Sequence, residues 1–574
     1  MAPPVLDALL AQIKSDLLSG RAGAALAGAR QAVEAFDSRP KAHYALASAL
    51  IANGELDQAE SALNTAQNTQ ALQMLAGGGV DLARMQTDAP YAMAMGRRFY
   101  NADLLGAASL ACACTAHDPA IAHGVSAGLH VWAQSLFHQG GWKMEQALRA
   151  FIAAFNAAPS PGLYSFILYT LFFVENGRAR HAVEARNWNK ACAAQFMPAT
   201  PIHQVEPRAG RPLRIGYLAP SFTTNQIRRF AHPLLNGHDT SRFEVFAYVD
   251  DASKEALADH VTVRSVKPLT YDLNAKLIAA DKIDVLIDVW GHAANSRLLV
   301  MARKPAPVQI SWLNNIQTTG MDAIDHVIHS DFMDAPGTEA LFTENILNVG
   351  PVLATYRPVD EAQPSPAPVL TRGHVTFGSF NHPAKISEHG IRAWARILRA
   401  VPTARLLLKY NYFVDPVVQD TLRAKFLGLG ADSSQIDFEG FSRGADYEAS
   451  FAGVDLMLDT GPVNGGTTTM EAFSRGVPVL TVDDKTDFYA RMGVQPLMAL
   501  GMEEMIAPDW DAYVAKAVAL AHDPRALAAL RARVRPALDA SVYRDEEGFI
   551  ARMEELYVSA FEAWVAKQAK QAAA

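Results

Sequence analysis

Short apolar segments alternate with helical or loop stretches along much of the chain, and this alternation constrains the fold more than any other feature. Near-continuous apolar runs separated by helix-length stretches predict parallel strands covered by helices on both faces. The sequence therefore predicts an α/β fold with two Rossmann-like lobes. The predicted strands are Leu213–Ala219, Phe243–Val249, Ile283–Val289 and Val308–Trp312 in the first lobe, and Val375–Phe380, Arg405–Tyr410, Ile436–Phe438, Leu456–Asp459 and Val477–Val482 in the second.

Clusters of proline mark the boundaries of the two lobes. We expect a linker at 197–212, an N-terminal Rossmann-like lobe at 213–357, an interlobe linker at 358–372 and a C-terminal lobe at 373–567. Residues 568–574 are expected to form a tail. Open α/β sheets bind ligands at the carboxyl ends of their strands, so two such lobes are expected to enclose a ligand-binding cleft.

Residues 1–196 are rich in alanine and leucine and predict an all-α domain. Gly20 and Gly54 are 34 residues apart, as are Ala25 and Ala59, each within an amphipathic stretch. That period is typical of tetratricopeptide (TPR) repeats, whose stacked helix pairs form a concave surface that binds a protein partner. A plain helical bundle is the alternative, because alanine-rich helices produce such matches by chance.

The composition excludes several classes of protein. The 51 basic side chains are outnumbered by 59 acidic ones, which argues against a nucleic-acid-binding surface. Three cysteines are too few for a disulfide framework or a four-cysteine zinc site, so a reducing compartment is favoured. Residues Met1–Lys14 lack the pattern of a signal peptide, and the apolar stretch Leu163–Val174 is too short to span a bilayer. We therefore expect a soluble, cytoplasmic protein that binds neither membrane nor nucleic acid.

The strongest local motif is Asp459–Glu471 (DTGPVNGGTTTME), which lies between an apolar strand and a helical pattern. Gly466 permits close approach of a ligand, and Thr467 and Thr468 stand where the helix would begin. Free backbone N–H groups at a helix N-terminus favour an anion such as phosphate. Glu471 lies one turn into the helix, where it can accept hydrogen bonds from ribose hydroxyls. The simpler alternative is a glycine-rich turn with a threonine N-cap.

Cationic and titratable residues follow other predicted strands. Lys385, in the motif Phe380–Lys385 (FNHPAK), can hold a phosphate or neutralise a departing one at the sheet edge, or it can simply be solvated. His292 follows a strand of the first lobe and is either a catalytic base or, like most isolated histidines, structural. Arg228 and Arg229 can bind a phosphate or carboxylate, or face solvent.

Three motifs resemble those of the tetratricopeptide-linked protein O-glycosyltransferases, which include the O-linked N-acetylglucosamine transferase, the SPINDLY proteins and bacterial flagellin glycosyltransferases. They are Arg303–Trp312, Phe380–Ile386 and Val454–Glu471. The resemblance, which extends from about Leu213 to Val565, implies a GT-B fold preceded by a TPR-like domain. It also implies an inverting, metal-independent bacterial enzyme that transfers a sugar from a nucleotide to Ser or Thr of a protein. The nucleotide-sugar is a co-substrate and no cofactor is implied; the acceptor protein would bind through the TPR-like domain.

The resemblance also implies roles for individual residues. Lys385 and the threonines Thr467 and Thr468 would hold the donor phosphates, with Lys385 acting in catalysis, and Glu471 would hold the ribose. His382 lies where a donor-contacting amide is common in the family. Further candidate contacts to the donor or the acceptor are Asn225, Arg228, Arg229, Gln309, Thr319, Gly320, Tyr447 and Gly466.

The sequence departs from the family pattern at positions that recognise the donor. Residues that are usually Lys or His are replaced at Asn225, Gly444, Tyr447 and Gly466. These differences argue against a UDP-N-acetylglucosamine donor. The resemblance to the flagellin glycosyltransferases implies instead a CMP-nonulosonate donor, whose sugar carboxylate would pair with Arg228 or Arg229, and flagellin as the acceptor. One alternative is a UDP-N-acetylglucosamine-dependent protein transferase. The other is a non-catalytic TPR adaptor with decayed transferase lobes.

Overall fold

The computed structural model describes residues 3–113, 122–175, 177–203, 205, 211–252, 255–314, 317–334, 336–358, 362–483 and 491–573. The chain forms two compact units. The first comprises Met1–Pro159, Ala362–Asp484 and Glu504–Arg535, and the second comprises Ser160–Glu361, Lys485–Glu503 and Pro536–Ala574. Each unit thus combines N-terminal helices with one α/β sheet, whereas the sequence assigned all helices of residues 1–196 to a single domain.

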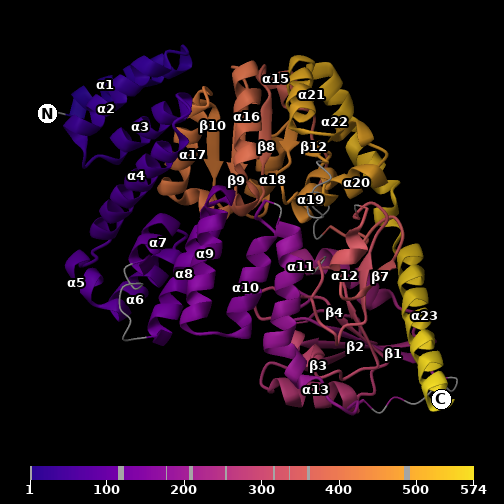
Figure 1. The fold of residues 1–574 in the computed structure, drawn as a ribbon. Helices are drawn as coiled ribbons and strands as arrows, with labels where there is room; N and C mark the ends of the chain where they lie inside the picture. Colours follow the sequence, from indigo (N-terminus) through magenta and orange to yellow (C-terminus); the bar gives the residue numbers. More distant parts are fainter. Residues whose placement is uncertain are drawn as a thin grey trace. The chain divides into compact units, whose positions relative to one another are not determined.

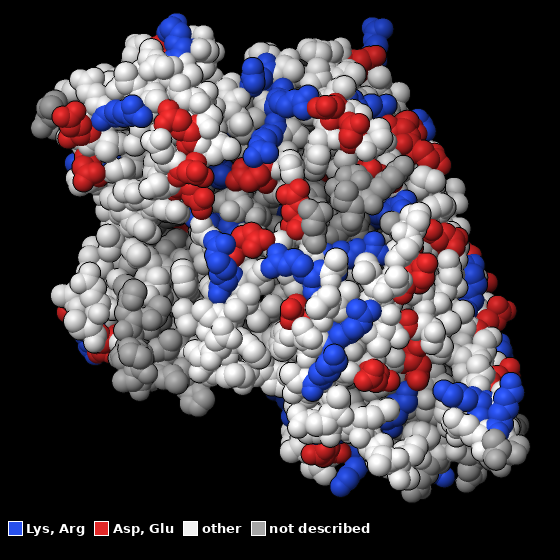
Figure 2. Space-filling model, in the orientation of Figure 1, with Lys and Arg blue, Asp and Glu red and all other residues white. Residues whose placement is uncertain are grey.

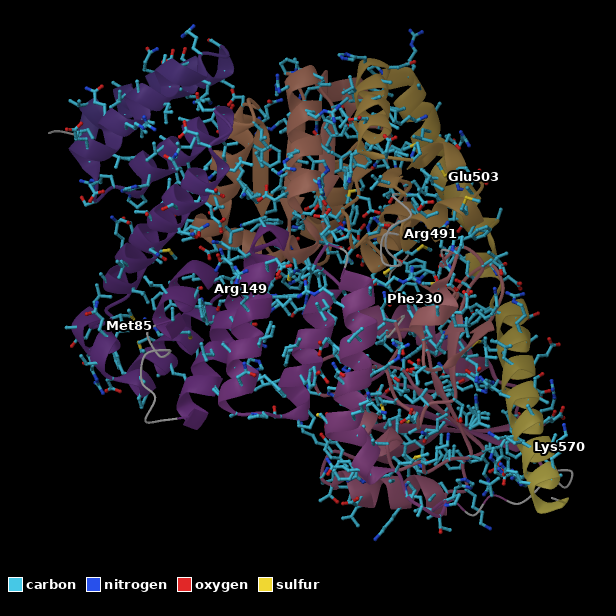
Figure 3. All side chains as sticks on the ribbon, viewed as in Figure 1. Met85, Arg149, Phe230, Arg491, Glu503 and Lys570 are labelled. Carbon is cyan, nitrogen blue, oxygen red and sulfur yellow. The ribbon has the colours of Figure 1, made fainter. Side chains whose placement is uncertain are left out.

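The N-terminal helices of the first unit form TPR-like hairpins (Figure 1). Gly20 and Gly54 end the first helix of two successive hairpins with φ of +72° and +77°, values that favour glycine. Ala25 and Ala59 are buried in the second helices, so the 34-residue period is a structural repeat. Met85, labelled in Figure 3, belongs to a separate core farther along these helices. The helices are α1 (Pro3–Leu18), α2 (Ala22–Phe36), α3 (Pro40–Ala52), α4 (Leu56–Gly77), α5 (Leu82–Thr87), α6 (Ala89–Tyr100), α7 (Leu105–Ala113), α8 (Ala122–Gln139) and α9 (Met144–Ala157).

These hairpins pack directly on helix α17 (Pro416–Gly428) of the C-terminal lobe. The Ser48 hydroxyl donates to the Ala424 carbonyl at 3.0 Å, and the Gln67 amide donates to the Thr421 hydroxyl at 2.8 Å. A Cβ atom at Gly428 would lie 2.7 Å from the Ser48 carbonyl oxygen, so the backbones touch. The first helices are therefore an integral part of the same unit as the C-terminal lobe.

The C-terminal lobe contains a parallel six-stranded sheet with the order β10-β9-β8-β11-β12-β13. This is the Rossmann order, in which the strand sequence reverses between β8 and β11. Loops that follow β8 and β11 consequently meet at the carboxyl edge of the sheet. The strands are β8 (Thr376–Ser379), β9 (Arg405–Lys409), β10 (Ile436–Glu439), β11 (Leu456–Leu458), β12 (Val479–Val482) and β13 (Ile506–Ala507). The helices of this lobe, besides α17, are α15 (Val369–Arg372), α16 (Glu388–Ala400), α18 (Ala445–Ala452), α19 (Thr467–Ser474), α21 (Trp510–His522) and α22 (Pro524–Asp539).

The second unit contains a parallel seven-stranded sheet with the order β3-β2-β1-β4-β5-β6-β7. Helices α10 (Pro161–Leu171) and α11 (Gly177–Trp188) belong to this unit. On α12 the Phe230 ring, labelled in Figure 3, lies 5.5 Å from the ring of Tyr356. The strands are β1 (Leu213–Leu218), β2 (Phe243–Val249), β3 (Thr262–Ser265), β4 (Val285–Asp288), β5 (Val308–Ser311), β6 (His326–His329) and β7 (Asn345–Asn348). Its other helices are α12 (Asn225–Gly237), α13 (Tyr271–Ala280), α14 (Leu298–Met301), α20 (Val494–Ala499) and α23 (Glu546–Ala573).

The structure therefore has two parallel-sheet α/β lobes and TPR-like helices, as expected from the sequence. Each predicted strand is present. The predicted tail at 568–574 differs, because α23 continues to Ala573. Basic and acidic side chains are interspersed on the face shown in Figure 2. Among the described residues, no helix combines the length and the apolar character needed to cross a bilayer.

Candidate functional site

Two loops of the C-terminal lobe meet where its strand order reverses. The loop after β8 forms a 3₁₀ turn, Pro383–Lys385, and the loop after β11 runs from Asp459 to Gly466. Ile386 pairs with Gly461 in a parallel bridge that joins the two loops. The Lys385 ammonium donates to the Asn464 carbonyl at 2.7 Å. The two strongest sequence motifs thus form one site, with the lysine of the first held by the glycine-rich loop of the second.

Asp459 organises the glycine-rich loop from within. One carboxylate oxygen accepts hydrogen bonds from the backbone N–H groups of Thr460 at 2.8 Å and Gly465 at 2.7 Å. The other accepts from the Thr481 hydroxyl at 2.8 Å. Burial raises the pKa of Asp459 to about 6, although these hydrogen bonds and the charge of Lys385 act in the opposite direction. The carboxylate therefore fixes the loop and supplies negative charge beside Lys385.

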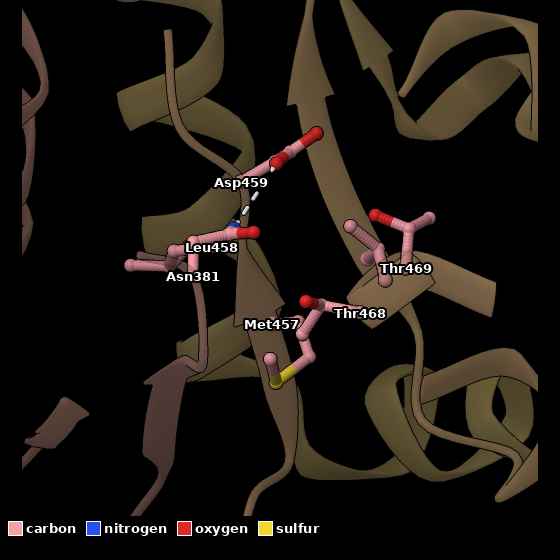
Figure 4. Close-up of a pocket in the computed structure, with 7 residues that line it drawn as sticks. Asn381, Met457, Leu458, Asp459, Thr468 and Thr469 are labelled. Carbon is pink, nitrogen blue, oxygen red and sulfur yellow. Dashed lines mark hydrogen bonds between the residues drawn. The ribbon is translucent and has the colours of Figure 1, made fainter. Parts of the chain in front are cut away.

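Helix α19 begins directly after this loop, with Gly466 as its N-cap. No side chain caps the helix, and Thr467 and Thr468 in its first turn are half-buried. The threonine N-cap proposed as the simpler reading of the motif is therefore absent from α19. A small pocket lies beside this turn (Figure 4). It is lined by Asn381, Met457, Leu458, Asp459, Thr468, Thr469 and Val479. An uncapped helix N-terminus near a lysine attracts an anion.

Glu471 and Tyr447, two further predicted contacts, lie together. The Tyr447 hydroxyl donates to a Glu471 carboxylate oxygen at 2.8 Å. The guanidinium of Arg475 lies over the Tyr447 ring, 5.4 Å from its centroid, and Arg475 also donates to the Glu471 carbonyl at 3.0 Å. Glu471 is only 7% exposed, so its carboxylate is held in one orientation within the first turns of α19.

His382 does not use its ring nitrogens toward an open site. Its Nδ1 accepts the Ala384 N–H at 2.9 Å, and its Nε2 lies 2.8 Å from Nδ1 of His138 on helix α8. Burial lowers the pKa of His382 well below its ordinary value. Both ring nitrogens of His382 are therefore occupied by contacts within the first unit. This geometry does not support a direct contact between these nitrogens and the sugar donor.

His292, the weaker catalytic candidate, has the environment of a structural residue. Its Nδ1 lies 3.1 Å from the Ser165 hydroxyl, and its Nε2 lies 3.1 Å from the Thr319 carbonyl. The ring packs edge-on against Trp188 at 4.7 Å between centroids. Burial lowers the pKa of His292 to about 4. Because both nitrogens are occupied and the side chain is buried, the geometry argues against the catalytic base hypothesis.

The remaining candidates near β5 also serve the interior of the second unit. The Gln309 amide donates to the carbonyls of Met301 at 2.9 Å and Ala323 at 2.8 Å. The Thr319 N–H donates to the buried Glu344 carboxylate at 2.7 Å. At Gly320 (φ +71°), a Cβ atom would lie 2.2 Å from the backbone of α11. These residues hold α11 and the strand ends together, and the structure gives them no role toward a ligand.

The first loop of the N-terminal lobe leads into α12, which begins at Asn225, whose side chain lies outside the described residues. Arg228 is exposed and Arg229 is half-buried. The Arg229 carbonyl accepts the Arg357 N–H at 2.9 Å. Arg228 and Arg229 lie one helical turn after Asn225 on α12.

Sequence reasoning missed three residues that shape the site: Asp459 as an organising carboxylate, Asn464 as the partner of Lys385, and His138. A buried acid between a strand and a glycine-rich turn was the available signal for Asp459. No sequence signal pointed to His138, because its partner His382 is 244 residues away along the chain. Within the described ranges, no group of three His, Cys, Asp or Glu residues has an arrangement that could hold a metal ion.

Comparison with known proteins identifies relatives of this chain. The model of glycosyl transferase family 41 matches residues 169–347 and 368–553. A probable UDP-N-acetylglucosamine–peptide N-acetylglucosaminyltransferase SPINDLY of Hordeum vulgare is 35% identical over 366 residues, which cover 61% of this chain and 38% of that protein. The Arabidopsis thaliana SPINDLY protein is 34% identical over 60% of this chain and 39% of its own length.

A solved structure matches nearly the whole chain. The O-GlcNAc transferase of Thermobaculum terrenum, in a mutant form, superposes with a TM-score of 0.73 at 25% identity and covers 99% of this chain and 100% of that one. By contrast, the chain spans about two fifths of the length of the curated relatives that it matches.

Proposed function

Because the chain belongs to glycosyl transferase family 41, we propose that it transfers a sugar from a UDP-linked donor to serine or threonine hydroxyls of an acceptor protein. The observation that carries this proposal is the placement of Lys385 beside the uncapped N-terminus of α19 at the strand-order reversal. Both features attract a diphosphate. The names of the relatives, which specify a UDP-sugar donor and a peptide acceptor, supply the substrate classes.

Lys385 and α19 would stabilise the leaving group. As the bond between the anomeric carbon and the diphosphate breaks, negative charge grows on the diphosphate oxygens. A preorganised ammonium and helix N–H groups are worth most in that transition state. The acceptor hydroxyl would attack the anomeric carbon from the opposite side, with inversion of configuration, and its proton would pass to water. We propose that these groups replace a metal ion.

Glu471 is proposed to bind the ribose hydroxyls, with Tyr447 orienting its carboxylate. The Tyr447 hydroxyl occupies one carboxylate oxygen at 2.8 Å, so the carboxylate is fixed before the nucleotide arrives. Such preorganisation reduces the entropy lost on binding. The TPR-like helices are proposed to contribute to binding of the acceptor protein.

The donor is proposed to be UDP-N-acetylglucosamine rather than a CMP-nonulosonate. The SPINDLY relatives are named as probable UDP-N-acetylglucosamine–peptide transferases, which supports this donor. The CMP hypothesis drew on the replaced Lys and His positions and on Arg228 and Arg229, and the structure gives no observation that favours pairing of these arginines with a sugar carboxylate. Flagellin as acceptor rested on the resemblance to flagellin glycosyltransferases and is not retained, because the relatives named above do not support it.

Calorimetry with UDP, CMP and GDP tests the proposal on the full chain. UDP should bind more tightly than CMP or GDP, and Lys385→Ala should weaken UDP binding by roughly 10- to 100-fold, as for loss of a charge-assisted hydrogen bond. Lys41→Ala, which removes an exposed lysine of the same unit, is the matched control for net charge and should bind like the wild type.

The second step of the test is transfer of labelled N-acetylglucosamine from UDP-N-acetylglucosamine to protein, with the modified residue mapped by mass spectrometry. Label on Ser or Thr supports the proposal. Tight binding of CMP without a response to UDP would restore the nonulosonate hypothesis. Failure to bind any nucleotide would favour the non-catalytic adaptor.

A further inference from the structure

The N-terminal helices reach the turn that carries Lys385. Helix α8 ends at Gln139, and a 3₁₀ turn, Gly141–Lys143, follows it. A Cβ atom at Gly141 would lie 2.5 Å from the carbonyl oxygen of Ile386 and 2.9 Å from that of Ala384. The backbone of the helical region therefore lies directly against the backbone of the Pro383–Lys385 turn, at a separation that only glycine permits.

A pair of histidines joins the same two segments. His138, in the last turn of α8, places Nδ1 2.8 Å from Nε2 of His382. Aromatic side chains that follow strand β9 pack against the two rings: the Tyr412 centroid is 4.5 Å from that of His138, and the Tyr410 centroid is 4.8 Å from that of His382. An apolar surrounding of this kind strengthens the hydrogen bond and makes an unpaired donor costly.

The hydrogen bonds fix where the protons are. The Ala384 N–H donates to Nδ1 of His382, so this nitrogen carries no proton. A neutral His382 then carries its proton on Nε2 and donates it to Nδ1 of His138. His138 is thus the acceptor that selects the tautomer of His382, and this tautomer accepts the Ala384 N–H. The Lys385 N–H in turn donates to the His382 carbonyl at 2.9 Å, which closes the turn.

We propose that His138 is a positioning residue for Lys385, and that the helical region is thereby part of the donor phosphate site. The chain of contacts runs from His138 through the His382 ring to the Ala384 N–H and the turn that aims the lysine. The proposal rests on the proposed function, because the effect of Lys385 is on a nucleotide diphosphate. On this proposal the N-terminal helices act in the donor site, in addition to their proposed role in binding the acceptor protein.

Two substitutions at His138 separate the hydrogen bond from the space that the ring fills. His138→Leu keeps apolar volume but removes the acceptor. His138→Asn places an amide oxygen near the position of Nδ1 and can still accept from His382. His130, on the same helix and packed on Phe151, provides the control His130→Leu, which should behave like the wild type.

The measurements are binding of UDP and of uridine, which lacks phosphate, and amide hydrogen exchange of the turn. His138→Leu should bind UDP roughly tenfold more weakly than the wild type and bind uridine equally well, with faster exchange of the Ala384 and Lys385 amides. His138→Asn should restore both. In a Lys385→Ala background, His138→Leu should have no further effect on UDP, because its influence passes through the lysine.

Wild-type UDP binding and wild-type exchange in His138→Leu would overturn the proposal. An equal loss of UDP and uridine would also overturn it, because that pattern indicates general damage to the lobe. If the wild type binds neither UDP nor uridine, the proposed function fails. The exchange comparison between His138→Leu and His138→Asn then still decides whether His138 positions the turn.

Discussion

Asp459→Asn should stabilise the folded protein and should weaken UDP binding at alkaline pH. The pKa of Asp459 rises from 3.8 to about 6 on folding, so the fold disfavours the ionised carboxylate by about 3 kcal/mol at neutral pH. An asparagine can still accept the N–H groups of Thr460 and Gly465, and the Thr481 hydroxyl can turn to meet its amide. The free energy of unfolding of the variant should therefore exceed that of the wild type by up to about 3 kcal/mol at pH 7.5.

The pH dependence follows from the direction of the shift. A carboxyl whose pKa is raised by folding stabilises the folded state fully below its unfolded pKa, and this contribution is lost as pH rises through the folded value. The advantage of Asp459→Asn should thus be roughly half as large at pH 5 as at pH 7.5. Thermal unfolding of variant and wild type at the two pH values measures it. A variant less stable than the wild type at pH 7.5 would refute this reasoning.

Binding of UDP to the same variant tests the link with Lys385. Burial lowers the pKa of Lys385 to about 8, and the charge of Asp459 opposes that shift. Without the carboxylate the lysine should lose its proton at lower pH, so the decline of UDP affinity with rising pH should begin earlier. Asp415→Asn is the matched control. Asp415 is also buried with a pKa raised to about 6, but it accepts N–H groups of Gly106 and Val417 instead. Because backbone N–H groups occupy both Asp415 oxygens and an asparagine has only one acceptor oxygen, Asp415→Asn should be less stable than the wild type. It should nevertheless leave UDP binding unchanged.

Three further predictions concern the reaction. In the wild type, kcat/KM should be constant from pH 7 to about 8 and fall tenfold per unit above it, as Lys385 loses its proton; a flat profile to pH 10 would exclude a role for its charge. His292→Asn should lower the melting temperature, because the residue bonds Ser165 and Thr319, but should leave kcat within about twofold; a 100-fold loss of kcat would make it catalytic. Transfer should persist after dialysis against EDTA, and restoration of a lost activity by Mg²⁺ or Mn²⁺ would contradict the proposed metal-free mechanism.

Elements with strong apolar runs could be predicted from the sequence. The strands β1, β2, β4 and β5, like most of those in the second sheet, are buried on both faces and therefore read as continuous hydrophobic segments. The four missed strands lack that signal: β3 and β7 are half-exposed, β6 begins and ends with histidine, and β13 has only two residues. Local polarity hides an edge strand, because its pairing is decided by tertiary contacts.

In the site, too, features that are contiguous in sequence could be predicted, and features that depend on distant residues could not. Lys385 and the Thr467–Glu471 turn could be found because strand, loop and helix are contiguous in sequence, and parallel topology brings such loops to one edge. The environments of His292 and His382 could not be found, because Ser165 and His138 come from helices far away along the chain. The contacts of Ser48 and Gln67 with α17 were not predicted either, because the partner residues are far away along the chain. The sequence therefore predicted a single helical domain at 1–196.

A crystal structure of the complex with UDP would show whether Lys385 and α19 hold the diphosphate. We expect the diphosphate at the N-terminus of α19, with a phosphate oxygen about 3 Å from the Lys385 ammonium and from backbone N–H groups at Thr467 and Thr468. We also expect the ribose hydroxyls on the Glu471 carboxylate. A diphosphate bound elsewhere, with Lys385 still on the Asn464 carbonyl and more than about 5 Å from any phosphate oxygen, would contradict this expectation.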